Sequence, residues 1–239
     1  MSIGFCNGIF YRIKNSLGRF SRETIKRCKI GNAIELHLAD EGMVDYLLEH
    51  QNTDLSGFSF ISIHAPCIEY KNNNQSKEIL EKLNQICLDR KIVNVVFHTD
   101  LIIDWDIFNK YRDIPISIEN VDERGKNGRF VKDIKPILDK YNFGLTLDLQ
   151  HCFCNDRTMG LAKEFQEIFK DKIVEYHISG FDEKLLHYPL FKTRQDEIIK
   201  SLKYKDIPII IESTFDDINE QLEELEYIKD RITKGDSNN

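Results

Sequence analysis

The chain has 239 residues, of which 41% are hydrophobic and 31% are charged, and its formal net charge is −7. This length allows one large or two small globular domains, and the negative charge gives no overall attraction to nucleic-acid backbones. No window approaches about eighteen consecutive apolar residues, and the first residues lack the apolar stretch of a signal peptide, so we expect a cytoplasmic protein without a membrane span. Its six cysteines form no regular framework and are expected to be free thiols, including the C-x-C pair Cys152 and Cys154.

Eight short runs rich in β-branched residues are predicted to be strands: residues 2–9, 32–38, 58–65, 93–99, 114–121, 143–149, 173–179 and 207–214. Apolar residues at three- and four-residue spacing predict helices at 76–91, 129–141, 160–170, 194–204 and 217–232. This alternation, at about thirty residues per unit, favours a single (β/α)8 TIM barrel over an open doubly wound sheet. We expect the barrel domain to cover residues 1–233 and a flexible tail to cover 234–239.

The third to eighth predicted strands each end in a polar residue that can point into the barrel. In chain order these residues are His64, His98, Glu119, Asp148, His177 and Glu212. Because the carboxyl ends of barrel strands meet at one mouth, we expect the six side chains to converge. Three carboxylates within about 5 Å of one another repel by roughly 3 kcal/mol per pair at an effective dielectric of about 20. Since imidazole and carboxylate together suit zinc, manganese, iron or cobalt, the pattern predicts a divalent-metal site.

Four further residues are candidates for substrate binding. Glu35 shares a face with His37 at the end of the second strand, so it could line the mouth or lie behind the ligands. His151 and His187 follow the sixth and seventh strands, and both could reach the mouth from loops. Arg124 lies in a basic loop after the fifth strand, where it could hold a phosphate or carboxylate, although a solvated charged loop is the simpler interpretation.

Seven short motifs together resemble the xylose isomerase-like TIM-barrel superfamily, which includes endonuclease IV and many sugar isomerases and epimerases. The motifs are IEL (34–36), IHAP (63–66), VVFH (95–98), IEN (118–120), LDLQH (147–151), YHIS (176–179) and IES (211–213). No single motif is specific, but their order and spacing carry the resemblance, which extends from the second to the eighth strand.

The sugar-epimerase branch of this superfamily holds one metal through ligands on strands five to eight. The resemblance implies that these ligands are Glu119, Asp148, His177 and Glu212, that the two glutamates exchange protons with the substrate, and that His151 contacts it. It therefore implies a divalent-metal-dependent sugar or sugar-phosphate isomerase or epimerase, which transfers a proton next to a metal-chelated carbonyl. One or two ions are expected, with zinc or manganese favoured.

The endonuclease IV branch implies a different chemistry, zinc-dependent phosphodiester hydrolysis. There, histidines of strands three and four join the shared glutamate at a second zinc, and His64, His98 and Glu119 match this pattern. A third zinc in that branch uses a D-x-x-H histidine and a D-x-H pair, of which His151 and His187 match the histidines.

Three features favour a small polyhydroxylated or phosphorylated substrate over DNA. Leu185 stands where the aspartate of the D-x-H pair would be, and Asp182 could substitute only at a different spacing. The loop at 39–43 is acidic where a loop that follows phosphates should be basic, and Tyr70 is the only aromatic residue near enough to wedge a duplex. A non-catalytic metabolite-binding relative remains an alternative, and a homodimer is possible since many such barrels pair.

Overall fold

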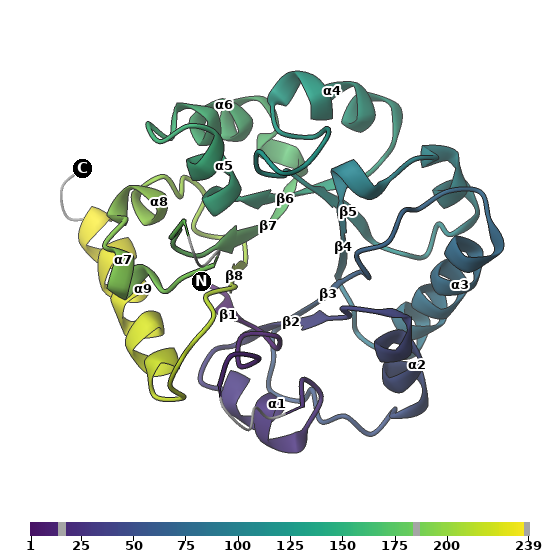
Figure 1. Cartoon of the computed structure of the whole chain (residues 1–239), viewed down its shortest axis with the longest axis horizontal. Helices are drawn as coiled ribbons and strands as arrows, with labels where there is room; N and C mark the ends of the chain where they lie inside the picture. Colours follow the sequence, from purple (N-terminus) through teal and green to yellow (C-terminus); the bar gives the residue numbers. More distant parts are fainter. Residues whose placement is uncertain (14–17, 184–186, 237–239) are drawn as a thin grey trace.

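The structure is a computed structural model that describes residues 1–13, 18–183 and 187–236. Its strands are β1 (Ile3–Cys6), β2 (Ala33–His37), β3 (Phe60–His64), β4 (Asn94–His98), β5 (Ile116–Glu119), β6 (Gly144–Asp148), β7 (Ile173–Ile178) and β8 (Ile209–Ile211). All neighbouring strands are parallel and follow sequence order, and β1 also pairs with β8 (Figure 1). The predicted (β/α)8 barrel is therefore confirmed, and the β1–β8 pairing excludes an open sheet.

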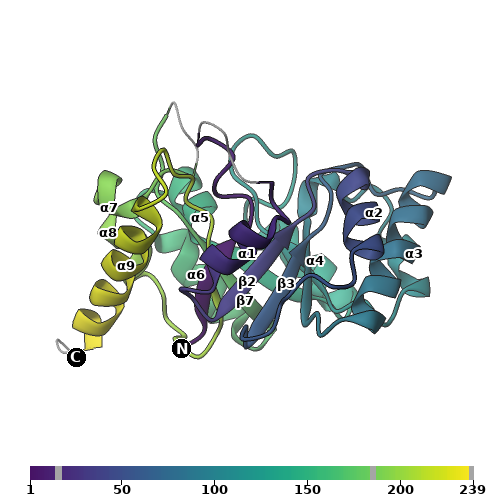
Figure 2. The same ribbon diagram turned by 90° about the horizontal axis from the view of Figure 1, so that it is seen from below.

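Helices surround the barrel on its outer face (Figure 1). They are α1 (Arg22–Cys28), α2 (Glu41–Glu49), α3 (Asn74–Asp89), α4 (Val131–Lys140), α5 (Leu149–Asn155), α6 (Gly160–Ile168), α7 (Leu190–Thr193), α8 (Asp196–Lys200) and α9 (Glu220–Asp236). Figure 2 shows α3 and α9 alongside the barrel at opposite sides. Between β4 and β5 the chain forms two 3₁₀ segments instead of an α-helix, at Thr99–Leu101 and Trp105–Lys110, and a third precedes β7 at Lys170–Lys172.

None of the predicted helices covers α1, α2, α5 or α7, and the predictions for 194–204 and 234–239 also differ from the structure. The predicted helix at 194–204 is α-helical only over α8, because Arg194 adopts a left-handed conformation with φ of 59° and separates it from α7. The predicted tail starts too early, since α9 continues to Asp236 with a Lys234–Asp230 ion pair of 2.7 Å in its last turns. Residues 237–239 of that predicted tail lie outside the described part of the chain.

The two faces of the barrel strands differ in chemistry. The outward residues, such as Ile118, Leu147 and Tyr176, are fully buried beneath the helices. The inward residues form a buried polar layer, in which Glu175 accepts hydrogen bonds from Ser62 Oγ at 2.7 Å and Asn94 Nδ2 at 2.6 Å. This polar layer lies one side-chain position below the strand ends on the same face, and so it forms the floor beneath the predicted site.

Two global expectations can be compared with the structure. Among the described residues, no helix has the length and apolar character needed to cross a membrane. All six cysteines are free thiols, as predicted.

Candidate metal centre

The strand register brings the six predicted strand-end residues together around Glu119. His98 on β4 is paired with Glu119 on β5, and Asp148 on β6 with His177 on β7. Glu119 Oε2 lies 3.4 Å from His64 Nε2 and 3.2 Å from His98 Nε2. Glu119 Oε1 lies 3.1 Å from His177 Nδ1. One carboxylate therefore faces donor atoms on both sides.

The first donor group consists of Glu119, Asp148, His177 and Glu212, whose ligand atoms all lie within 4.8 Å of one another. His177 Nδ1 is 3.6 Å from Glu212 Oε1 as well as close to Glu119. Glu212 directly follows β8, and its backbone N–H still donates to Ile178 O at 3.0 Å, so the residue continues the strand into the mouth. The other three side chains are buried, whereas that of Glu212 is 12% exposed and forms the open side of the group.

Asp148 occupies its place because it both ends β6 and begins α5. Its Oδ1 accepts the backbone N–H of His151 at 2.8 Å, which is an N-cap interaction. The Asn120 side chain fixes the Asp148 backbone, accepting from its N–H at 2.7 Å and donating to its carbonyl at 2.9 Å. The D-x-x-H spacing is therefore the first turn of a helix, and the expectation that His151 lies in a loop is wrong.

The chemistry of the first donor group fits a divalent cation. Among the described residues, Asp148 Oδ2 and Glu119 Oε2 are buried oxygens without a hydrogen-bond partner, although the other oxygen of each carboxylate is engaged. Burial raises the pKa of Glu212 to about 8, although His177 opposes the shift. Burial disfavours a charged His177, yet Glu212, Glu35 and Glu119 raise its pKa well above the ordinary value. The carboxylates around His177 therefore favour a positive charge among them, and a cation bound by imidazole and carboxylate would supply it.

A second donor group lies on the other side of Glu119. It consists of His64, Cys67 and His98, whose ligand atoms are also within 4.8 Å of one another. His64 Nδ1 lies 3.0 Å from Ala65 O, so an Nδ1–H donor leaves Nε2 facing Glu119. Sequence reasoning found the two histidines but missed Cys67, although its position directly after the IHAP motif could have indicated it.

Glu35 does not line the mouth. Its side chain is fully buried, and its Oε2 lies 3.2 Å from His177 Nε2, behind the first donor group. Glu175, which sequence reasoning also missed, lies 3.5 Å from the same nitrogen. Two carboxylates thus approach the face of His177 away from Glu119, an arrangement that orients ligating imidazoles in metal sites. Glu35 thus lies behind the ligands, which is one of the two positions expected for it from the sequence.

His151, His187 and Arg124 lie around the mouth in different ways. His151 Nδ1 is 2.8 Å from Asn120 O, and its ring lies 6.0 Å from that of His187. His187 Nδ1 is 3.1 Å from Ser179 Oγ and 3.5 Å from Glu212 Oε2. Arg124 is paired with Asp122 through Nε at 2.8 Å, and its side chain is 54% exposed. The two histidines therefore meet at the Glu212 side of the mouth, while Arg124 is an exposed and partly neutralised cation.

Four features of the sequence bear on a third zinc or on DNA binding. Leu185 lies outside the described residues, and the donor groups found among the described residues do not include Asp182. Tyr70 is 1% exposed, and its hydroxyl donates to Pro66 O at 3.0 Å, so it cannot wedge a duplex. The acidic stretch 39–43 was expected to be a loop, but its residues 41–43 form the first turn of α2, and the N-cap Asp40 accepts from Met43 N at 3.0 Å.

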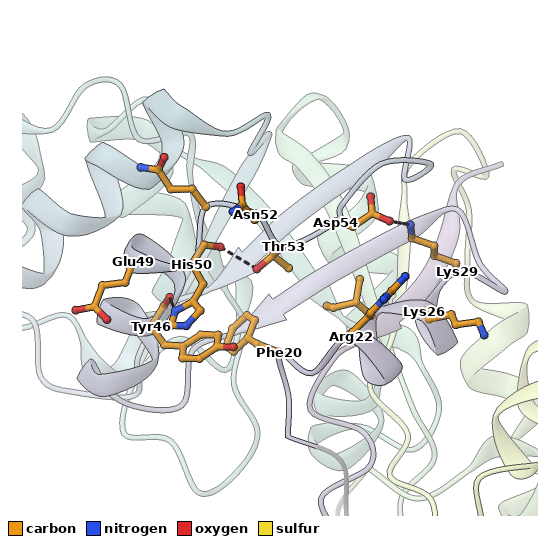
Figure 3. Close-up of a pocket in the computed structure, with 12 residues that line it drawn as sticks. Phe20, Arg22, Lys26, Lys29, Tyr46, Glu49, His50, Asn52, Thr53 and Asp54 are labelled. Atoms are coloured by element: carbon orange, nitrogen blue, oxygen red, sulfur yellow. Dashed lines mark hydrogen bonds and ion pairs between the residues drawn. The ribbon is translucent and has the colours of Figure 1, made fainter.

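A separate cavity of about 910 Å³ lies between α1 and α2, outside the barrel (Figure 3). Phe20 and Tyr46 stack there with ring centroids 5.5 Å apart, and Lys29 forms an ion pair with Asp54 at 2.7 Å. None of the residues lining it belongs to either donor group. This cavity is therefore distinct from the candidate metal centre.

Comparisons with known proteins agree on the architecture. No family model matches the sequence, and no curated protein is significantly similar to it. Endonuclease IV from Thermus thermophilus is 12% identical with a TM-score of 0.66, over 98% of this chain and 100% of that chain. A D-allulose 3-epimerase from Methylomonas sp. in complex with D-allulose is 16% identical with a TM-score of 0.64, over 97% of each chain.

The 3-keto-D-glucoside 4-epimerase from E. coli is 10% identical with a TM-score of 0.62, over 96% of this chain and 99% of that chain. At such identities the likeness establishes the fold and not the reaction. It extends over nearly the whole chain in each case, and it includes both branches that the strand-end motifs resemble. The protein therefore shares the (β/α)8 barrel fold of these solved structures, which come from both branches that its motifs resemble.

Proposed function

We propose that the protein is a divalent-metal-dependent isomerase or epimerase that acts on a small sugar or sugar phosphate. The observation that carries this proposal is the placement of two glutamates around one donor group. Glu119 and Glu212 come from β5 and the end of β8, with the strands of Asp148 and His177 between them, and both contact His177 Nδ1. A substrate carbon held above His177 would have one carboxyl group available on each side.

The residues at the mouth of the barrel would have separate roles in such a reaction. Glu119, Asp148, His177 and Glu212 would hold the metal. When bound, a divalent cation would polarise a ketose carbonyl and the neighbouring hydroxyl and so acidify the C–H between them. One glutamate would accept that proton at a carboxylate oxygen, and the other would return a proton from the opposite side. His151 would meet a substrate hydroxyl, and Arg124 would meet a phosphate where the substrate carries one.

Deuterium exchange tests this proposal directly. The protein, loaded with manganese, zinc or cobalt, is incubated in D2O with a panel of ketoses and their phosphates, and exchange at the carbon beside the carbonyl is followed by NMR. At metal concentrations that saturate both proteins, we expect Glu212→Gln to lose exchange by roughly 10²- to 10⁴-fold, the usual contribution of a positioned acid or base. Glu226→Gln, an exposed substitution on α9, is the matched control and should leave exchange unchanged. Exchange that persists in Glu212→Gln would contradict the proposal.

A second function, metal-dependent phosphodiester hydrolysis, is favoured by the contacts of Glu119 on its other oxygen. His64 Nε2 and His98 Nε2 both lie within 3.4 Å of Glu119 Oε2, so the two donor groups share this carboxylate. Two ions bridged in this way are typical of enzymes that cleave phosphate esters. Nicking of a duplex with an abasic site, together with absence of exchange in every ketose, would establish this function in place of the first.

A further inference from the structure

We propose that Cys67 is a metal ligand of the second donor group, together with His64 and His98, and that its sulfur makes this group selective for zinc. The sulfur and one nitrogen of each imidazole lie within 4.8 Å of one another. Glu119 Oε2 is 3.4 and 3.2 Å from the two imidazoles. Two nitrogens and one sulfur thus lie close enough to share one ion, and Glu119 Oε2 lies beside both nitrogens; imidazole, thiolate and carboxylate are the donor types that zinc takes.

The imidazole of His64 is oriented for this role. Its Nδ1 lies 3.0 Å from Ala65 O, a main-chain acceptor that fixes the proton on Nδ1. Nε2 then carries the lone pair and faces Glu119 Oε2. A ligating histidine whose other nitrogen donates to a carbonyl is the usual arrangement in metal sites.

The loop that carries Cys67 is held in place from below. Pro66 O accepts the hydroxyl of buried Tyr70 at 3.0 Å and the backbone N–H of Ile68 at 2.8 Å. The Tyr70 ring packs edge-on against Phe97 with centroids 4.9 Å apart. Tyr70 therefore anchors the segment after β3, and Cys67 is presented at the mouth on a supported turn.

The sulfur distinguishes this group from the first donor group. Thiolate ligands favour zinc and other soft metals, whereas manganese and magnesium favour oxygen. Binding through sulfur releases the thiol proton to solvent, because the thiolate is the ligand. The two donor groups around Glu119 would then differ in metal preference. The group of His64, Cys67 and His98 would prefer zinc, and the first donor group, which has only imidazole and carboxylate ligands, would be less selective.

Cobalt substitution reports the sulfur ligand without any substrate. Metal-free protein is titrated with cobalt(II), and absorbance is recorded for the thiolate-to-cobalt charge-transfer band and for the ligand-field bands of the bound ion. The variants are Cys67→Ser and, as the matched control, Cys87→Ser, which removes another partly exposed thiol on α3. Circular dichroism of each variant verifies the fold.

We expect the charge-transfer band in the wild type and in Cys87→Ser, and its loss in Cys67→Ser. The zinc affinity of the second donor group should fall in Cys67→Ser. The fall should exceed the roughly 10- to 100-fold loss that is usual when a residue hydrogen-bonded to a metal ligand is replaced. Zinc should also protect exposed Cys67, but not Cys87, from alkylation, as mapped by mass spectrometry. A band that persists in Cys67→Ser, or a wild type that binds cobalt without the band, would overturn the inference.

The inference shares with the proposed function only the role of Glu119 as a ligand. The spectrum and the alkylation pattern are measured without substrate, so their outcome is independent of ketose exchange. A charge-transfer band without ketose exchange would contradict the isomerase proposal alone. Ketose exchange without the charge-transfer band would contradict this inference alone.

Discussion

The polar layer beneath the metal centre predicts a large stability difference between two substitutions of one residue. Glu175 is fully buried on β7 and accepts hydrogen bonds from Ser62 Oγ and Asn94 Nδ2 through its two different oxygens. Replacement by alanine leaves both donors without this acceptor in the barrel interior. Replacement by glutamine keeps the length of the side chain and one acceptor oxygen.

The expected magnitude follows from the contacts of Glu175. A buried donor that loses its partner costs about 1–3 kcal/mol, so Glu175→Ala should lose about 2–6 kcal/mol from hydrogen bonds, and Glu175→Gln about half of that. Alanine also removes two buried methylenes worth about 0.8 kcal/mol each. Both variants remove the buried charge, so relief of its desolvation cancels in the comparison. We therefore expect Glu175→Ala to be less stable than Glu175→Gln by about 3–5 kcal/mol.

Urea unfolding at neutral pH, followed by circular dichroism, measures this difference as a shift of the midpoint at unchanged slope. Stabilities that agree within about 0.5 kcal/mol would refute the reasoning, because they would mean that Ser62 and Asn94 lose nothing with the carboxylate. A change of slope would instead indicate that the compactness of one state had changed and would require a second probe.

Two further predictions concern Asp148 and Glu224. In Asp148→Asn the amide oxygen can still cap α5, so the unfolding free energy should change by about 1 kcal/mol or less. Because the second carboxylate oxygen is lost as a ligand, metal affinity measured by calorimetry should fall at least tenfold. Equal losses of stability and of metal-binding free energy would contradict separate roles for the two oxygens. Burial raises the pKa of Glu224 from 4.5 to about 6, despite hydrogen bonds from Ser213 and from the first backbone N–H groups of α7. The folded state therefore binds this proton more tightly than the unfolded state. This contribution, at most about 2 kcal/mol, is complete below about pH 4.5 and is lost as the pH rises through 6. Glu224→Gln should flatten that part of the stability–pH curve measured by urea unfolding, and an unchanged decline would contradict the assignment.

The alternation of apolar strands and helices was enough to predict the barrel, and the strand-end residues were enough to predict the candidate ligands. Eight apolar strands that alternate with helices favour a closed parallel sheet covered by helices, and the polar residue at or near the end of each strand marks the mouth of that barrel. Because side chains alternate along a strand, the position of His177 or Glu119 relative to the end of its strand is enough to place it at the mouth. Local patterns of this kind need no knowledge of distant contacts.

The residues behind and beside these ligands follow from the three-dimensional fold and not from any local pattern. Glu35 and Glu175 both approach His177 Nε2, and this contact depends on the stagger of strands that are far apart in sequence. Cys67 joins His64 and His98 because the turn after β3 rests on buried Tyr70, which no spacing reveals. The short helix at His151 was missed for a related reason, since seven residues capped by Asp148 carry too little periodicity to be distinguished from a loop. Contacts across the barrel depend on the stagger and register of strands that are far apart in sequence, and a linear pattern carries no information about these two quantities.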